Sequence, residues 1–218
     1  MYKRIISLFL IMVFLAIGTT NVFAAEIDDG YDYVVSTYTI ACGSDKSNSV
    51  INCKLAAKEI DGTILEPDEE FSFNDIVGRR TAEKGYKSGT IISNGKRTTG
   101  IGGGICMLAT CIFNAALEGN FKITERHYHS LKMGYVPEGR DASIYWETAD
   151  LKFKNNYDVP IKVSIEFANK KMTVSLLSKE KVKVPDAKVK TRLIKGIYYT
   201  YRYVGWDINY VTKSIYKG

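Results

Sequence analysis

The chain has 218 residues and a formal net charge of +6, and its lysines are spread along the chain rather than gathered in blocks. This distribution argues against a nucleic-acid-binding protein, which typically carries a basic arm or one strongly basic face. The length is enough for a single domain with its own core, with or without a small appendage. The 15 tyrosines fit either a body rich in β-structure or a surface that faces carbohydrate.

Residues 1–24 have the pattern of an export signal. Lys3 and Arg4 precede an apolar run over 5–17, and 22–24 offer small residues for cleavage. The apolar run is shorter than the roughly 20 residues of a membrane span, so cleavage is expected, with a retained N-terminal anchor as the alternative. The mature chain is therefore expected outside the cytoplasm, secreted or associated with the cell wall, without a stable membrane span.

The first hundred residues predict short, alternating elements. A strand is expected over 31–40, a short helix over 50–60 and a short strand at Phe71-Ser72-Phe73. Asn94-Gly95 lies between strand-like residues and predicts a hairpin within 91–98.

Two of the four cysteines flank a polar loop. In an exported protein the spacing of Cys42 and Cys53 favours a local disulfide. Cys106 and Cys111 are expected on one helix, where five residues separate Cα atoms by roughly 8–9 Å, beyond the ~7 Å limit for a disulfide.

Glycines precede Cys106 directly. Gly102-Gly103-Gly104 leads into a helical pattern that ends near Gly119, with Cys106 in the first turn. The partial positive charge of a helix N-terminus lowers the pKa of a thiol there. Glycines also let backbone N–H groups approach a developing oxyanion closely. The sequence therefore predicts a nucleophile, with a buried structural cysteine as the alternative.

The chain has two histidines, and they lie close together after this helix. If the segment is extended, His127 and His129 face the same side, and either could be the base for Cys106. Asp141, in a following turn, is a candidate to orient the imidazole. The alternatives are two surface histidines, or a zinc ion held by Cys106, His127 and His129.

The second half of the chain reads mainly as strands. They are expected at 143–146, 151–154, 161–167 and 172–177 and as two aromatic strands within 197–211, with 179–190 as an edge strand or a connector. The elements together predict an α+β fold in which a mixed or antiparallel sheet packs on the Cys106 helix and further hairpins complete the body.

Eight motifs occur in one order: Phe71-Ser72-Phe73-Asn74, Val77-Gly78-x-Arg80-Thr81, Gly85-Tyr86, Gly100 to Cys106, Asn114-Ala115-Ala116, Glu125-Arg126-His127-x-His129-Ser130, Tyr135 to Ala142, and Asp150 to Asn156. In this combination the chain resembles the VanW domain family over roughly residues 50–167, and 197–217 also resembles its C-terminal strands. The resemblance implies a single VanW-like domain over 50–218, preceded by an N-terminal strand and loop over 25–49.

The resemblance also implies a function. Some members of this family are L,D-transpeptidases that cross-link peptidoglycan through a cysteine, whose position corresponds to Cys106, and the histidine most often retained corresponds to His129. The expected partners are peptidoglycan stem peptides, with no metal or organic cofactor, and the protein is expected to be a monomer. Met107 and Ala109 stand where family members usually carry polar residues, which leaves a non-catalytic wall-binding protein as the alternative.

Further residues are expected to bind the substrate. Arg80 or Arg140 could hold a stem-peptide carboxylate through a bidentate contact. Tyr135 is expected beside them, and Gly102, Gly103 and Gly104 form the backbone that faces the reacting carbonyl.

Overall fold

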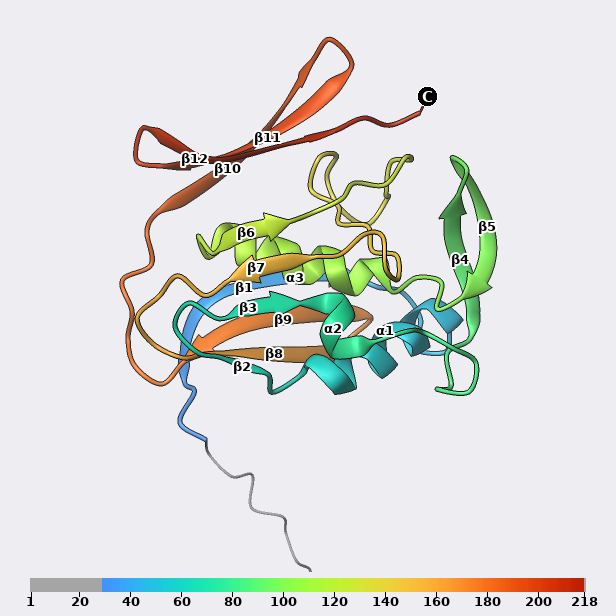
Figure 1. Ribbon diagram of the computed structural model, residues 1–218, viewed down its shortest axis with the longest axis horizontal. Helices are drawn as coiled ribbons and strands as arrows, with labels where there is room; N and C mark the ends of the chain where they lie inside the picture. Colours follow the sequence, from blue (N-terminus) through green and yellow to red (C-terminus); the bar gives the residue numbers. More distant parts are fainter. Residues whose placement is uncertain (1–28, 218) are drawn as a thin grey trace, which may run out of the picture.

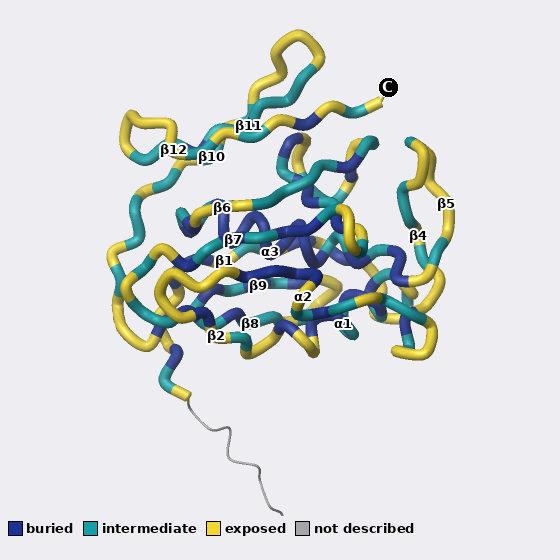
Figure 2. Tube along the Cα trace, in the orientation of Figure 1, coloured by how far each residue is buried: buried dark blue, intermediate teal, exposed yellow. Residues whose placement is uncertain are grey.

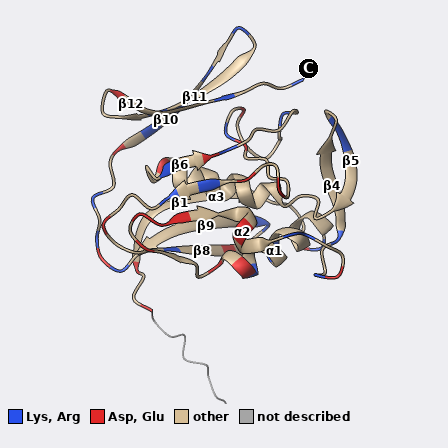
Figure 3. Ribbon diagram, viewed as in Figure 1, with Lys and Arg blue, Asp and Glu red and all other residues tan. Residues whose placement is uncertain are grey.

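A computed structural model describes residues 29–217, in which four antiparallel sheets combine with three helices (Figure 1). The expected α+β class is confirmed. The expected export signal lies outside the described residues. Within 29–217, no helix combines the length and the hydropathy that a membrane crossing requires. Acidic and basic residues are distributed over most elements (Figure 3).

The largest sheet has four strands in the order β1-β9-β8-β2. These strands are β1 (Tyr33–Ala41), β2 (Ile64–Leu65), β8 (Ile161–Ala168) and β9 (Lys171–Ser178). Strict alternation predicts the β8–β9 hairpin, and the structure confirms it. The turn residues Asn169 and Lys170 have φ of 52° and 60°, the left-handed conformation of a two-residue hairpin turn. Inward-facing aliphatic side chains of both strands are buried in the core.

The central element is α3 (Cys106–Glu118), which packs against β1 and β9 on the main sheet and also contacts β6 and β10. The sequence pattern predicts one buried stripe. In the structure, residues 108–117 are all buried (Figure 2). The helix is therefore covered on several sides, as its nearly continuous apolar sequence requires. A second helix, α1 (Asn48–Ile60), contacts α3 and β8.

A second sheet has the order β3-β7-β6, with bounds β3 (Glu70–Ser72), β6 (Lys122–Glu125) and β7 (Lys152–Lys154). Phe71 stacks on Phe153 with ring centroids 4.9 Å apart. The strand expected at 71–73 ends one residue earlier in the structure, because Phe73 begins α2 (Phe73–Val77). The Ser72 hydroxyl caps this helix by accepting from the Asp75 N–H at 3.1 Å. The expected strand at 143–146 is not formed: Ser143 and Tyr145 make only isolated bridges.

Two further sheets complete the fold. The hairpin of β4 (Ser88–Ser93) and β5 (Lys96–Ile101) turns at Asn94-Gly95, as the sequence predicts. The chain then closes with the sheet β10-β11-β12, whose bounds are β10 (Ala187–Ile194), β11 (Ile197–Val204) and β12 (Asp207–Ser214). Residues 179–186 are a connector, and the two aromatic strands around Gly205-Trp206-Asp207 are confirmed as β11 and β12.

Candidate functional site

Cys106 is the first residue of α3, and it is half-buried, whereas the helix interior is fully enclosed. Its Sγ lies 3.7 Å from the carbonyl oxygen of Ile144, in the segment that follows Asp141. The nucleophile candidate therefore lies between the glycine loop and the segment 126–144.

The glycine loop is packed too closely for side chains. A Cβ on Gly103 would lie 2.2 Å from the carbonyl carbon of Gly89 in β4, and one on Gly104 would lie 2.3 Å from Cβ of Ser49. Gly102 and Gly104 also have φ of +78° and +95°, which glycine adopts most readily. These residues therefore bring the chain against β4 and α1 before α3 begins.

Some backbone N–H groups of the glycine loop donate hydrogen bonds within the loop, and others have no acceptor in the described part of the chain. Gly103 N–H donates to Gly100 O at 3.1 Å, and Ile105 N–H donates to Gly102 O at 3.3 Å. Within residues 29–217, neither the N–H of Gly104 nor that of Cys106 has a hydrogen-bond acceptor. Unpaired donors are usual in a first helical turn, and both of these residues are half-buried rather than enclosed.

His129 connects the thiol to a carboxylate. Its Nδ1 lies 2.7 Å from Oδ2 of Asp141, and the same oxygen accepts from the His129 backbone N–H at 2.6 Å. The ring and the Cys106 thiol also act on each other, since His129 lowers the pKa of the thiol and Cys106 raises that of the ring. Because Asp141 occupies Nδ1, Nε2 is the nitrogen left for sulfur. The order thiol, imidazole and carboxylate is that of an activated cysteine nucleophile.

The ionisation of this group follows from its contacts. Burial favours the neutral forms, but His129, the backbone of Ile144 and the charge of Arg80 hold the pKa of Cys106 below its ordinary value. Burial likewise opposes protonation of His129, yet Asp141 and Cys106 raise its pKa to about 9. Both shifts favour the thiolate of Cys106 and the imidazolium of His129.

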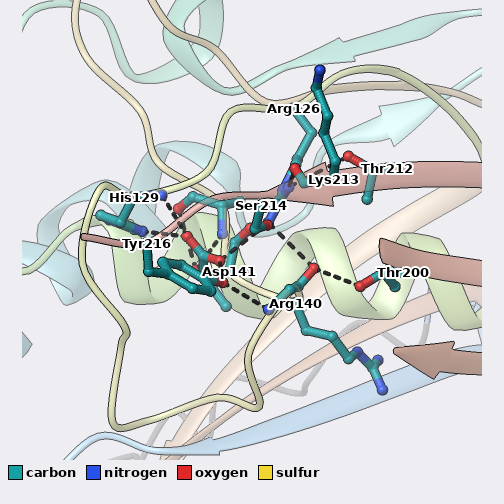
Figure 4. A network of polar contacts seen from close by, with 12 residues as sticks. Arg126, His129, Arg140, Asp141, Thr200, Thr212, Lys213, Ser214 and Tyr216 are labelled. Carbon is teal, nitrogen blue, oxygen red and sulfur yellow. Dashed lines mark hydrogen bonds and ion pairs between the residues drawn. The ribbon is translucent and has the colours of Figure 1, made fainter. Parts of the chain in front are cut away.

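Asp141 is itself held by residues far away in sequence (Figure 4). Its Oδ1 accepts from Arg126 Nη2 at 3.1 Å and from the Tyr216 hydroxyl at 2.6 Å. Burial raises the pKa of Asp141, but the contacts with His129, Arg126 and Tyr216 lower it overall, so the carboxylate stays ionised. Sequence reasoning missed Arg126 and Tyr216. The partners are 15 and 75 positions away from Asp141, and no local pattern indicates either contact.

Arg80 and Tyr135 lie beside the thiol. Arg80 Nη1 donates to Oδ1 of Asn74 at 2.7 Å and to Gly78 O at 3.0 Å, and its charge acts on Cys106. Burial and the charge of Cys106 hold the pKa of Tyr135 well above its usual range, although Thr110 acts in the lowering direction. The structure thus brings both residues together with Cys106.

His127 and Arg140 have partners elsewhere. The chain leaves β6 after Glu125, so the expected alternation fails: His127 Nε2 pairs with Glu125 Oε1 at 2.8 Å, whereas His129 pairs with Asp141. Arg140 pairs with Asn114 and Glu118 near the C-terminal end of α3, the opposite end from Cys106.

The zinc alternative lacks a ligand set in the described part of the chain. No three His, Cys, Asp or Glu side chains between residues 29 and 217 are arranged to hold a metal ion. His127, which this alternative requires, is occupied by Glu125. A zinc ion held by Cys106, His127 and His129 is therefore not supported.

The other cysteines are free and buried. The predicted disulfide between Cys42 and Cys53 is not formed. The Cys53 thiol instead faces the glycine loop and donates to Gly104 O at 3.4 Å, because this position of α1 points into the core. Cys111 donates to Tyr38 O at 3.2 Å, and burial raises its pKa to about 12. Neither buried thiol shares the activation of Cys106.

Comparison with known proteins identifies the family. A family model described as VanW like protein matches residues 48–177. The chain is 40% identical over 149 residues to the uncharacterized protein YoaR of Bacillus subtilis, covering 66% of this chain and 49% of that protein. It is 33% identical over 132 residues to the vancomycin B-type resistance protein VanW of Enterococcus faecalis, covering 58% of this chain and 48% of that protein.

The chain therefore spans about half the length of each of these relatives. No solved structure matches it significantly. The match of the family model covers more than half of the chain and contains Cys106, His129 and Asp141. This chain belongs to the VanW family.

Proposed function

We propose that the protein is an exported, cell-wall-associated enzyme that transfers acyl groups on peptidoglycan stem peptides through Cys106, as an L,D-transpeptidase. The observation that carries the proposal is the series Cys106, His129 and Asp141, in which Asp141 holds the imidazole at 2.7 Å and the imidazole lowers the pKa of the thiol at the start of α3. The resistance named in the Enterococcus faecalis relative supports a substrate in the cell wall.

The first half-reaction forms a thioester. The Cys106 thiolate attacks the carbonyl carbon of the donor amide, and a C–S bond forms while the carbonyl oxygen becomes an oxyanion. The free N–H groups of Gly104 and Cys106 are the proposed donors to that oxyanion. As the C–N bond breaks, imidazolium His129 gives its Nε2 proton to the leaving amine.

The second half-reaction restores the thiolate. An acceptor amine from a second stem peptide attacks the thioester carbonyl, and neutral His129 takes the proton that the amine loses. The C–S bond breaks, a new amide forms, and Cys106 leaves as a thiolate beside imidazolium His129. Asp141 keeps Nδ1 of the ring occupied throughout both steps.

Arg80 is the proposed anchor for a stem-peptide carboxylate. Its Nη1 is fixed by Asn74 and Gly78, and its guanidinium carbon lies 5.9 Å from the ring centroid of Trp146. Within the described residues, no side chain or carbonyl takes a hydrogen bond from its other nitrogens. A positioned guanidinium with free donors suits a planar carboxylate.

The test is incubation of the mature protein with defined muropeptides, read by mass spectrometry. Cross-linked dimers should form with the wild type and not with Cys106→Ala. The matched control is Cys111→Ala on the same helix, which should retain turnover. If the wild type forms neither dimers nor hydrolysed products and Cys106 resists alkylation at neutral pH, the protein is a wall-binding member of the family without catalysis.

A further inference from the structure

We propose that Tyr216, in the C-terminal segment after β12, is a positioning residue of this site, whose hydroxyl fixes Asp141 and thereby holds His129 toward Cys106. The inference rests on the proposed role of Cys106 as a nucleophile. The family model matches residues 48–177, so that match assigns nothing to Tyr216.

The contacts run through a single carboxylate. The Tyr216 hydroxyl donates to Asp141 Oδ1 at 2.6 Å and accepts from the Gly139 N–H at 2.7 Å. The other oxygen, Oδ2, holds His129 at Nδ1 and at the backbone N–H. Because both oxygens belong to one planar group, fixing Oδ1 also sets the direction of Oδ2. Burial raises the pKa of Tyr216 to about 12, so the hydroxyl remains a donor over the whole physiological range.

The C-terminal segment is attached at the same place by several other contacts. Arg126 donates to the carbonyl of Lys213 at 3.1 Å and to the hydroxyl of Ser214 at 3.0 Å. The Lys217 N–H donates to the carbonyl of Ser130, next to His129, at 2.8 Å. The segment that carries the base is thus hydrogen-bonded to the C-terminal segment on both sides of His129, and Figure 4 shows the contacts on the Arg126 side.

Gly139 shows how tightly this contact is packed. Its carbonyl accepts from the Thr200 hydroxyl at 2.9 Å, and a Cβ at this position would lie 2.6 Å from the same hydroxyl oxygen. Its φ of +82° also favours glycine. The turn before Asp141 can therefore lie directly against β11, which places Tyr216 within reach of the carboxylate.

The charge on Asp141 links this geometry to the thiol. The titratable and charged groups that face Asp141 are Arg126, His129, Tyr135, Tyr216 and, through His129, Cys106. The Tyr216 hydroxyl lowers the pKa of Asp141, so its loss raises that pKa. Without the Tyr216 hydroxyl, Asp141 is held less firmly toward His129 and stabilises its imidazolium less, so Cys106 ionises only at higher pH.

The experiment compares Tyr216→Phe with Tyr198→Phe in the full chain. The Tyr198 ring lies 5.4 Å from that of Tyr216, but its hydroxyl interacts with Lys132 rather than Asp141. Alkylation of Cys106 by iodoacetamide is followed from about pH 5 to about pH 10, with peptide mass spectrometry to separate it from the other cysteines. Tyr216→Phe should slow the reaction about tenfold at mildly acidic pH, the effect of one lost hydrogen bond to a charged group. It should leave the rate at the alkaline end unchanged.

Each result decides the matter. An unchanged pH profile in Tyr216→Phe, or equal slowing at every pH, overturns the positioning role while Cys106 remains a reactive nucleophile. Equal effects of Tyr216→Phe and Tyr198→Phe also overturn it, because they indicate general loosening of the sheet. If the wild-type thiol is not alkylated at neutral pH, the proposed function itself fails, and the positioning role fails with it.

Discussion

Replacement of His129 by alanine tests the activation of Cys106 directly. The pKa of His129 is raised from an ordinary value of 6.5 to about 9, which corresponds to about 3 kcal/mol of preference for the imidazolium. Asp141 and Cys106 both contribute to this preference. If the interaction between the thiolate and the imidazolium supplies about half of this preference, it is worth about 1.5 kcal/mol. Removal of His129 then lowers the population of the Cys106 thiolate about tenfold. Burial then raises the pKa of Cys106 against only the backbone contact with Ile144 and the charge of Arg80, so the loss at neutral pH should be about tenfold or more.

The assay is the rate of iodoacetamide alkylation of Cys106 at pH 7, with melting temperature measured alongside. The matched control is His127→Ala, because His127 pairs with Glu125 outside the site and should change the rate less than about twofold. Undiminished alkylation in a folded His129→Ala variant would refute the ion-pair argument. Equal losses in the two variants would show that the histidines act together, contrary to the geometry.

Three further results are expected. Cys106→Ala should abolish dimer formation from muropeptides and change the free energy of unfolding by no more than about 1–2 kcal/mol, whereas Cys111→Ala should lower the melting temperature and keep turnover. Turnover measured against pH should fall as pH rises through about 9, because His129 then loses the proton that it gives to the leaving amine; an activity that keeps rising above that pH would contradict this role. Gly103→Ala should cost about 3 kcal/mol or more in urea unfolding, since its Cβ would lie 2.2 Å from backbone in β4, while Gly134→Ala, with nothing within 4 Å, should be nearly neutral.

Local signals in the sequence predicted the local structure well. Asn94-Gly95 alone is enough to specify the β4–β5 turn, because both residues adopt positive φ. The alternation over 161–167 reports which face of β8 is buried, and the hairpin follows from it. The helix that begins at Cys106 was likewise visible in the spacing of its apolar residues.

Contacts between distant segments were beyond local patterns. The spacing of Cys42 and Cys53 says nothing about the direction of the Cys53 side chain, which faces the glycine loop instead of its predicted partner. The alternation of side chains along a strand predicted that His127 and His129 face the same side. This alternation applies only within a strand, and β6 ends at Glu125. The Asp141–Tyr216 contact joins residues 75 positions apart, and nothing near either residue encodes it.

The position of α3 has a consequence for how the site keeps its shape. Amide protons of a helix that is covered by several sheets exchange with solvent only when those layers separate, which makes such a helix one of the last parts of a protein to open. Cys106 is the first residue of this helix, whereas most residues of the β4–β5 hairpin beside it are exposed or half-exposed. The proposed nucleophile is thus attached to an element that is expected to open late. If peptidoglycan is the substrate, motions of the surrounding loops can admit this bulky polymer without displacing the sulfur.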